Sequence, residues 1–412
     1  MKEKFALIGK TLKHSYSKKI HTLFNKYDYD LVELSENELG EFAANKEYRC
    51  YNVTIPYKKD IMKYLDEITD GASKIGAVNT VVFKNGMKIG YNTDFQGMIY
   101  MLNRAKISVK DKAVLILGSG GTSNTALAVT KYLGAKSVNV ISRTGEFNYK
   151  NCYDFKDTEI IINTTPVGMY PNTENSPIDI KRFDKLCGVV DVIYNPFLTK
   201  LLYDARKMGV KYTNGLPMLV AQAKYAMDLF LDNKFDDTII EKVLEKLKKE
   251  VLNIVLIGMP GSGKSTISKK LSMLLGKEMM DTDEEIIKRE NKSIPEIFEC
   301  FGEEYFRDLE KEVIKDTCKL SGKIIATGGG VVKDFDNYFY LKQNGIIFYI
   351  DRPINMLDKK GRPLSTNDLA VQKLYDERKE LYEKFSDFII DNGNSLENAV
   401  KGVIDCYEDF ID

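Results

Sequence analysis

The chain has 412 residues, more than one hydrophobic core usually organises, so its length predicts two or three domains. Lys and Arg (60 residues) balance Asp and Glu (60 residues), and the charge therefore gives no indication of a nucleic-acid partner. No apolar run has the length of a membrane span or a signal peptide, and we expect a cytoplasmic protein without a membrane partner. Six scattered cysteines lack C-x-x-C spacing and are typical of reduced thiols, while two histidines are too few for a histidine-based metal site.

The first hundred residues alternate short apolar runs with helical stretches, and polar clusters stand where the strands end. These clusters are His14–Ser17, Asn52–Lys59, Gly76–Thr80 and Gly90–Asp94. Any one of them alone is more typical of a turn. Because loops at strand ends gather polar groups for a ligand, four such clusters together indicate a binding site.

A strand–helix–strand unit follows over residues 112–141. The apolar strand Lys112–Leu117 leads into the glycine turn Gly118–Ser123, a helix from about Asn124 to Leu133, and the strand Ser137–Ile141. This is the dinucleotide pattern, although a serine stands at the third glycine position. A structural unit without a nucleotide is the alternative.

The residues at the end of the second strand favour NADP over NAD. It carries Ser142-Arg143-Thr144 in place of an acidic residue, which suits the 2′-phosphate of NADP. Further strands are expected at Glu159–Asn163 and Gly188–Ile193, and a helix is expected at Met218–Leu231.

Seven motifs of this first part occur in an order that resembles shikimate dehydrogenase, over residues 1 to about 235. They are His14–Ser17, Asn52–Lys58, Gly76–Thr80, Asn92–Asp94, Asn163–Met169, Asp191–Pro196 and Met218–Ala223. The resemblance implies an α/β substrate-binding domain over residues 1–103, completed by a helix near 216–232, and a Rossmann-like NADP-binding domain over residues 104–215.

The resemblance also implies roles for particular residues. Lys58 and Asp94 would be the catalytic pair, and a lysine in reach of a ketone can donate the proton that the developing alkoxide needs. The substrate would be held by Ser15, Ser17, Thr54, Asn79, Asn92, Tyr194 and Gln222. NADP would be lined by Asp70, Gly118, Ser119, Gly120, Gly121, Thr122, Ser123, Arg143, Thr144, Val192 and Gly215.

The junction between the two halves is polar and charged. Ile239, Ile240, Val243, Leu244 and Leu247 have helical spacing, so we expect a helix here and a domain boundary near Lys249.

The strand Asn253–Ile257 then leads into the segment Gly258–Thr266, which is followed by a helix over Ile267–Leu275. This is the phosphate-binding loop G-x-x-x-x-G-K-[ST] between a strand and a helix, as the motif requires. Its glycines let backbone N–H groups turn toward a polyphosphate, Lys264 can reach the terminal phosphates, and the Ser265 hydroxyl can ligate Mg²⁺. The segment predicts a nucleoside triphosphate site.

Five further features accompany this loop. We expect Met280–Asp283 to close the next strand with its carboxylates near the phosphate loop, and Gly361–Leu364 to form a lid. Arg378 is expected to open a helix; the other two features are Gly302–Arg307 and the glycine turn Ala326–Val331. Each arginine in these features, taken alone, would be more typical of a solvent-exposed surface residue or of an ion pair.

Together these features resemble shikimate kinase, with a nucleoside-monophosphate-kinase-like P-loop fold over residues 250–412. The resemblance implies that Asp283 orients or deprotonates the attacking hydroxyl and that Asp281, with Ser265, helps to place Mg²⁺. ATP would be held by Gly261, Ser262, Gly263, Lys264, Ser265, Thr266 and Arg362. Shikimate would be held by Asp283, Arg307, Gly328, Gly329, Gly330 and Arg378.

The two resemblances meet at one molecule, because the first half would make shikimate from 3-dehydroshikimate and NADPH and the second would phosphorylate it from MgATP. We therefore expect an α/β bifunctional enzyme that acts on small molecules in aromatic amino acid biosynthesis. A relative with altered substrate range, such as a quinate dehydrogenase, and a catalytically silent nucleotide-binding regulator are the alternatives. The residues do not indicate an oligomeric state.

Overall fold

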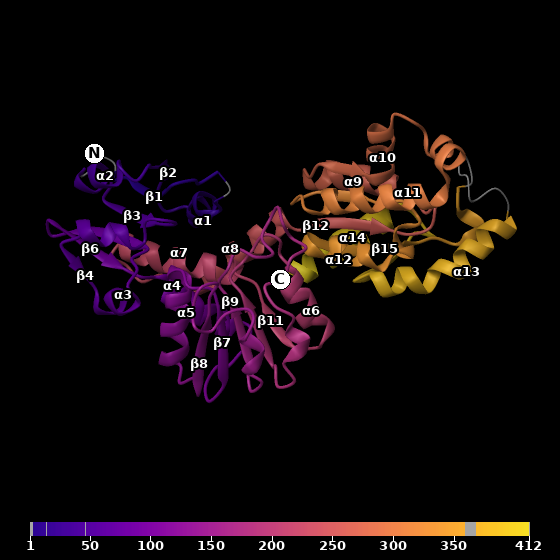
Figure 1. The fold of residues 1–412 in the computed structure, drawn as a ribbon. Helices are drawn as coiled ribbons and strands as arrows, with labels where there is room; N and C mark the ends of the chain where they lie inside the picture. Colours follow the sequence, from indigo (N-terminus) through magenta and orange to yellow (C-terminus); the bar gives the residue numbers. More distant parts are fainter. Residues whose placement is uncertain (1–2, 14, 46, 359–367, 412) are drawn as a thin grey trace. The chain divides into compact units, whose positions relative to one another are not determined.

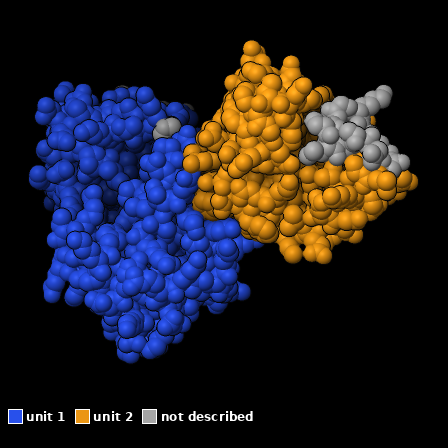
Figure 2. All heavy atoms as spheres, turned by 45° about the vertical axis from the view of Figure 1, so that its right-hand side comes forward, with its two compact units in different colours: residues 1–194, 199–244 blue, residues 195–198, 245–412 orange. Residues whose placement is uncertain are grey.

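The structure is a computed structural model that describes residues 3–13, 15–45, 47–358 and 368–411. The chain forms two compact units, Met1–Tyr194 with Thr199–Leu244 and Asn195–Leu198 with Glu245–Asp412, which Figure 2 shows in blue and orange. Helix α8 (Thr238–Val251) contains the division, so the helix expected at the junction is present. The finer domain limits expected from the sequence remain predictions.

The first unit begins with a mixed sheet of strand order β2-β1-β3-β5-β6-β4. The strands are β1 (Phe5–Gly9), β2 (Tyr29–Glu33), β3 (Cys50–Val53), β4 (Glu67–Ile68), β5 (Thr80–Lys84) and β6 (Met87–Tyr91). Alternate residues of β1 face opposite sides, as the period of a strand requires. Ala6 and Ile8 pack toward α2 (Leu39–Ala44) and α3 (Asp70–Ile75), whereas Phe5 and Leu7 pack against Phe230 and its neighbours.

The second sheet of this unit is parallel, with the strand order β11-β10-β9-β7-β8. Its strands are β7 (Ala113–Leu117), β8 (Ser137–Ile141), β9 (Ile160–Asn163), β10 (Gly188–Asp191) and β11 (Lys211–Thr213). Besides α2, α3 and the start of α8, the unit has helices α1 (Ser17–Phe24), α4 (Asp94–Arg104), α5 (Gly121–Tyr132), α6 (Lys200–Lys207) and α7 (Leu216–Phe230), several of which surround this sheet in Figure 1. Helices α4 and α5 pack on strands β7 and β9, and their apolar side chains form one core.

The second unit has a parallel sheet of strand order β13-β14-β12-β15-β16. Its strands are β12 (Asn253–Ile257), β13 (Met279–Asp281), β14 (Ile324–Ala326), β15 (Gly345–Asp351) and β16 (Phe388–Asp391). Helices α11 (Ile294–Cys318), α12 (Phe335–Asn344) and α13 (Asp368–Phe385) share one core with Val255 and Ile257 of β12. The remaining helices are α9 (Lys264–Leu275), α10 (Thr282–Glu290) and α14 (Leu396–Ile411).

The α/β fold class is thereby confirmed, but two local expectations are wrong. Asp283 does not end a strand, because the Asp281 side chain accepts a hydrogen bond from the Asp283 N–H and so starts helix α10 at Thr282. Arg378 does not open a helix, because α13 already runs from Asp368. Among the described residues, no helix has both the length and the apolar character that crossing a membrane requires.

Candidate active sites

Lys58 and Asp94 form a partly buried ion pair in the first unit. Lys58 follows strand β3, Asp94 is the first residue of α4, and the Lys58 Nζ lies 2.6 Å from the Asp94 Oδ2. Their side chains are 17% and 10% exposed. The Lys58 Cδ lies 4.0 Å from the place that a Cβ on Gly121 would take, so the pair lies beside the glycine turn expected to bind a cofactor.

A buried amide network adjoins this pair. The Asn79 Oδ1 accepts a hydrogen bond from the Thr93 N–H at 2.7 Å, and the Asn79 Nδ2 donates to the Thr93 Oγ1 at 3.1 Å and to the Gln222 Oε1 at 3.4 Å. Asn92 donates to the Ala77 carbonyl at 2.9 Å. The structure thus brings Asn79, Asn92 and Gln222 together, and it adds Thr93, which the sequence analysis missed although it stands between Asn92 and Asp94.

Ser15, Ser17 and Tyr194 come from distant parts of the chain. The Ser17 N–H donates to the Ser15 Oγ at 3.2 Å, and the ring of Tyr16 packs against that of Tyr194 with centroids 5.2 Å apart. Burial raises the pKa of Tyr194 to about 12, so its hydroxyl stays protonated and can donate to a carboxylate. Thr54 packs against Gly9 at the end of β1. His14 lies outside the described residues.

The glycine turn after β7 has the geometry of a dinucleotide loop. Gly118 has φ +114°, and the Ser123 Oγ donates to the Gly118 carbonyl at 2.7 Å, so the serine at the third glycine position closes the turn. A Cβ on Gly120 would meet no atom of the described residues within 4 Å. Ser119 is exposed and Thr122 is half-buried on the same turn. Gly121 begins α5, whose first N–H groups can meet a phosphate.

Two further groups of residues were expected to line the NADP site. A Cβ on Gly215 would lie 1.9 Å from the Val192 carbonyl oxygen, so only glycine allows these two backbones to approach so closely. Arg143 and Thr144 are exposed after β8, and Arg143 has no hydrogen-bond or ion-pair partner among the described residues. An exposed guanidinium beside the turn suits a phosphate ester. The residues present therefore fit NADP.

Asp70 is the exception among the expected cofactor residues. Its side chain is 81% exposed and pairs with Lys74 at 2.6 Å on α3. It lines a separate cavity of about 1350 Å³, whose walls also include Phe95, Asn124 and Tyr225 but none of the other residues expected to bind NADP. The structure does not bring Asp70 to the glycine turn.

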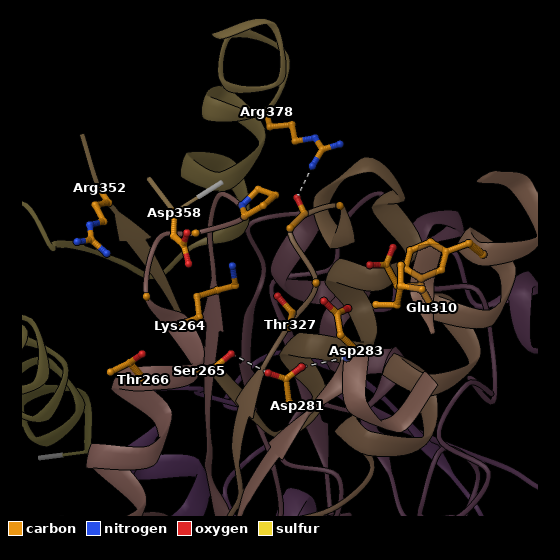
Figure 3. A pocket seen from close by; sticks show the side chains of 18 of the residues that line it. Lys264, Ser265, Thr266, Asp281, Asp283, Glu310, Thr327, Arg352, Asp358 and Arg378 are labelled. Atoms are coloured by element: carbon orange, nitrogen blue, oxygen red, sulfur yellow. Dashed lines mark hydrogen bonds between the residues drawn. The ribbon is translucent and has the colours of Figure 1, made fainter. Parts of the chain in front are cut away.

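The second unit has a cavity of about 480 Å³ that collects most of the expected kinase residues (Figure 3). Those that line it are Gly261, Gly263, Lys264, Ser265, Thr266, Asp281, Asp283, Arg307, Gly328, Gly329, Gly330 and Arg378. Ser262 is fully buried within the loop, and Arg362 lies outside the described residues.

The phosphate loop has a backbone that only glycine adopts readily. Gly261 and Gly263 have φ +84° and +95°, and a Cβ on Gly261 would lie 2.4 Å from the Asp358 carbonyl oxygen. The Lys264 Nζ donates to the carbonyls of Gly258 and Met259, at 2.9 and 3.0 Å. The loop and the start of α9 thus form a cradle that fits a polyphosphate.

Ser265 and Asp281 lie at the floor of this cavity. The Ser265 Oγ donates to the Asp281 Oδ2 at 2.8 Å, as a dashed line in Figure 3 shows. Among the described residues, no group of three His, Cys, Asp or Glu side chains could hold a metal. This donor set still fits Mg²⁺, which commonly uses one or two protein ligands together with waters and substrate phosphates.

Asp283 and Glu310 are buried carboxylates on the same side of the cavity. Within the part of the chain that the structure describes, the Asp283 Oδ1 and the Glu310 Oε1 have no hydrogen-bond partner. Each lies 2.7 Å from the place that a Cβ on Gly328 would take. Burial raises the pKa of Asp283 to about 7; Asp281 and Glu310 add to this, whereas Lys264 and Arg307 oppose it. A carboxylate of this kind can accept a proton near neutral pH.

Two arginines face the carboxylates. The Arg307 Nη1 donates to the Glu310 Oε2 at 2.7 Å, and a Cβ on Gly330 would lie 2.1 Å from that nitrogen. The Arg378 Nη1 donates to the Gly329 carbonyl at 2.9 Å, while its buried Nε has no hydrogen-bond partner in the described ranges of the chain. These guanidinium groups can bind an anion that enters the cavity.

The lining residues that the sequence analysis missed include Glu310 and Arg352. Glu310 lies one helical turn after Arg307, and that i, i+3 spacing was the available signal. Arg352 directly follows β15, so its place at the carboxyl end of a parallel strand was the signal there.

Comparisons with known proteins agree with the family resemblance of each half of the chain. The family model described as shikimate kinase matches residues 260–408, and the one described as the shikimate dehydrogenase substrate binding domain matches residues 7–81. The chain is 40% identical over 268 residues to a shikimate dehydrogenase (NADP(+)) of Caldanaerobacter subterraneus, covering 58% of this chain and 95% of that protein. A shikimate dehydrogenase (NADP(+)) of Clostridium perfringens is 37% identical over 265 residues, covering 59% and 98%.

Solved structures give the same result for the first unit. Shikimate dehydrogenase 1 from Peptoclostridium difficile is 36% identical with a TM-score of 0.55, covering 60% of this chain and 98% of that chain. A chorismate mutase/shikimate 5-dehydrogenase fusion protein from Clostridium acetobutylicum is 38% identical with a TM-score of 0.57, covering 60% and 97%.

Proposed function

The chain belongs to the shikimate dehydrogenase family and carries a shikimate kinase domain at residues 260–408, and on this premise we propose which residues perform the two reactions. It is a bifunctional enzyme of the shikimate pathway that uses NADP in its first half and ATP in its second. The proposed reactions are the reduction of 3-dehydroshikimate to shikimate and the phosphorylation of shikimate to shikimate 3-phosphate.

The observation that supports the first assignment best is the 2.6 Å Lys58–Asp94 pair beside the glycine turn. Bound NADPH supplies the hydride that the ketone carbon accepts. Lys58 donates a proton to the oxygen as its negative charge develops, and Asp94 holds the lysine in position. Ser15, Ser17 and Tyr194 bind the substrate carboxylate with their hydroxyl groups.

In the second half, Asp283 accepts the proton of the attacking hydroxyl of shikimate. Arg307 and Arg378 bind the shikimate carboxylate, and Lys264 stabilises the charge on the phosphoryl group that ATP supplies. Ser265 and Asp281 place Mg²⁺. Support comes from the cavity itself, because it joins the phosphate loop, the buried carboxylate and both arginines in one space.

The experiment that tests both assignments uses one full-length chain and two variants. Lys58→Ala is expected to lose NADPH oxidation by 3-dehydroshikimate while it keeps ADP formation from shikimate and MgATP. Asp283→Asn is expected to lose ADP formation from shikimate and MgATP while it keeps NADPH oxidation by 3-dehydroshikimate. Comparing NADP⁺ reduction with shikimate and with quinate tests the substrate range in the same assay. A variant that lost both activities, or neither, would contradict the assignment.

A further inference from the structure

A buried polar cluster connects β9 and β10 in the dehydrogenase unit. Asp191 ends β10, Asn163 ends β9, and Thr199 precedes α6, and all three side chains are 0% exposed. Asn163 and Asp191 belong to two of the sequence motifs, yet neither has a role in the proposed reactions. Burying a carboxylate is costly, so its hydrogen bonds need an explanation.

The Asp191 carboxylate accepts three hydrogen bonds. Its Oδ1 accepts from the Asn163 Nδ2 at 3.0 Å and from the Ile193 N–H at 3.1 Å, and its Oδ2 accepts from the Thr199 Oγ1 at 2.7 Å. If the carboxyl group is protonated, its Oδ2 can donate to the Thr199 hydroxyl, and the Oδ1 still accepts from both N–H groups. The bonds to Asn163 and Ile193 therefore persist in either protonation state.

The bond to Ile193 fixes a short segment whose neighbours have proposed roles. Val192 lies against Gly215, and the Gly215 N–H donates to the Ile193 carbonyl at 2.9 Å. Tyr194 packs on Tyr16 beside the two serines. One peptide segment thus presents a residue to the cofactor and a residue to the substrate carboxylate, and the Asp191 side chain holds the peptide between them.

The bond to Asn163 extends the cluster to the loop after β9. The Asn163 Oδ1 accepts from the Thr165 N–H at 3.0 Å and from its hydroxyl at 2.7 Å. Thr164, the residue between them, packs against Gly118 of the glycine turn. Since dinucleotides bind at the carboxyl ends of parallel strands, the cluster links three of the loops that would surround NADP.

We infer that Asp191 is a positioning residue of the dehydrogenase reaction, which holds Val192 against the cofactor and Tyr194 against the substrate carboxylate. The inference rests on the proposed function of those two residues. Asp191 touches neither ligand itself. Its effect is to hold Val192 and Tyr194 in place, because a displacement of about 1 Å in such a segment is enough to reduce catalysis.

The test measures the KM for NADPH, the KM for 3-dehydroshikimate, and kcat in full-length Asp191→Ala and Asp191→Asn. Loss of the acceptors in Asp191→Ala is expected to raise both KM values about 10-fold or more. Asp191→Asn keeps an acceptor oxygen for both N–H groups and can donate to Thr199, so its KM values are expected to stay within about threefold of wild type. Asp157→Ala, which removes an exposed carboxylate of the same unit, is the matched control and is expected to change neither KM.

Kinase activity of the same chains shows that the second unit is present and folded in each variant. If Asp191 only stabilised the unit, Asp191→Ala would have a lower melting temperature and unchanged KM values, and this result would overturn the inference. An equal rise of the KM values in Asp191→Ala and Asp191→Asn would also overturn it. If Asp191→Ala does not fold, Thr199→Val decides, because it removes the hydroxyl that donates to Asp191 and otherwise only the long 3.4 Å bond that this hydroxyl accepts from the Leu202 N–H. A rise of about 3- to 10-fold in its KM values supports the inference, and unchanged values overturn it.

Tyr194→Phe separates this inference from the proposed function. An unchanged KM for 3-dehydroshikimate in Tyr194→Phe would contradict the proposed carboxylate contact. A raised KM in Tyr194→Phe, together with unchanged values in Asp191→Ala, would contradict the positioning role alone.

Discussion

The Lys58 ammonium donates a hydrogen bond of 2.6 Å to the Asp94 carboxylate, although the two residues are 36 positions apart in the chain. Strand β3 and helix α4 bring them together, and both side chains are largely withdrawn from water. A lysine held in this way is oriented for proton transfer before a substrate arrives.

Lys58→Ala is therefore expected to reduce the rate of NADPH oxidation by about 10²–10⁴-fold, the usual contribution of a positioned acid. The kinase rate of the same chain should stay at the wild-type level. Lys59→Ala is the control, since Lys59 is the adjacent residue and is exposed. If Lys58→Ala keeps most of its reductase rate, the proton comes from another group.

Arg143→Ala is expected to weaken NADPH binding about 10- to 150-fold and NADH binding very little. A charge-assisted contact to a phosphate contributes roughly 1.5–3 kcal/mol, and only NADPH has the 2′-phosphate. Titrations of both cofactors against Arg143→Ala and against Lys150→Ala, an exposed cation of the same loop, measure the difference. Equal losses for the two cofactors would assign Arg143 a structural role.

Much of the secondary structure around the two sites was predictable, because it depends on short, local patterns in the sequence. The glycine turns, the phosphate loop and the strands that precede them follow from short runs of sequence, and β8 and β12 have the predicted bounds. Helices α5 and α9 begin three residues before the predicted starts, at Gly121 and Lys264, because the glycine loops turn directly into them.

Other features depend on contacts between distant residues, which spacing does not reveal. The cluster of Asn163, Asp191 and Thr199 exists only because β9 and β10 are adjacent in the sheet. The same limit explains Asp70, since the position of a residue on α3 does not indicate which side of the unit the helix faces. A single sequence gives local conformation more readily than packing partners.

Asp283→Asn is expected to abolish most phosphoryl transfer and to preserve ATP binding, because the amide keeps the shape and loses the basicity. Since burial raises the pKa of Asp283 to about 7, its basic form increases as pH rises through that value. The wild-type kinase rate should therefore rise between about pH 6 and pH 8, with half of the change near 7. A rate that is independent of pH in this range would exclude Asp283 as the base.

Gly330→Ala is expected to raise the KM for shikimate in the kinase reaction, because its Cβ would lie 2.1 Å from the Arg307 Nη1 and would displace the guanidinium. A shift of this kind should cost about 10-fold or more. Gly402→Ala is the matched control, since the nearest atoms to its Cβ lie at 3.6 Å. Equal KM values in the two variants would show that Arg307 does not bind shikimate.

The central claim is that one chain performs two consecutive reactions, and a single incubation tests it most directly. Full-length protein receives 3-dehydroshikimate, NADPH and MgATP, and the loss of NADPH, the formation of ADP and the identity of the product are followed together. We predict that NADPH is oxidised, that ADP follows, that shikimate 3-phosphate accumulates, and that omitting NADPH prevents ADP formation. Oxidation of NADPH without ADP formation, or ADP formation from 3-dehydroshikimate when NADPH is omitted, would contradict the claim.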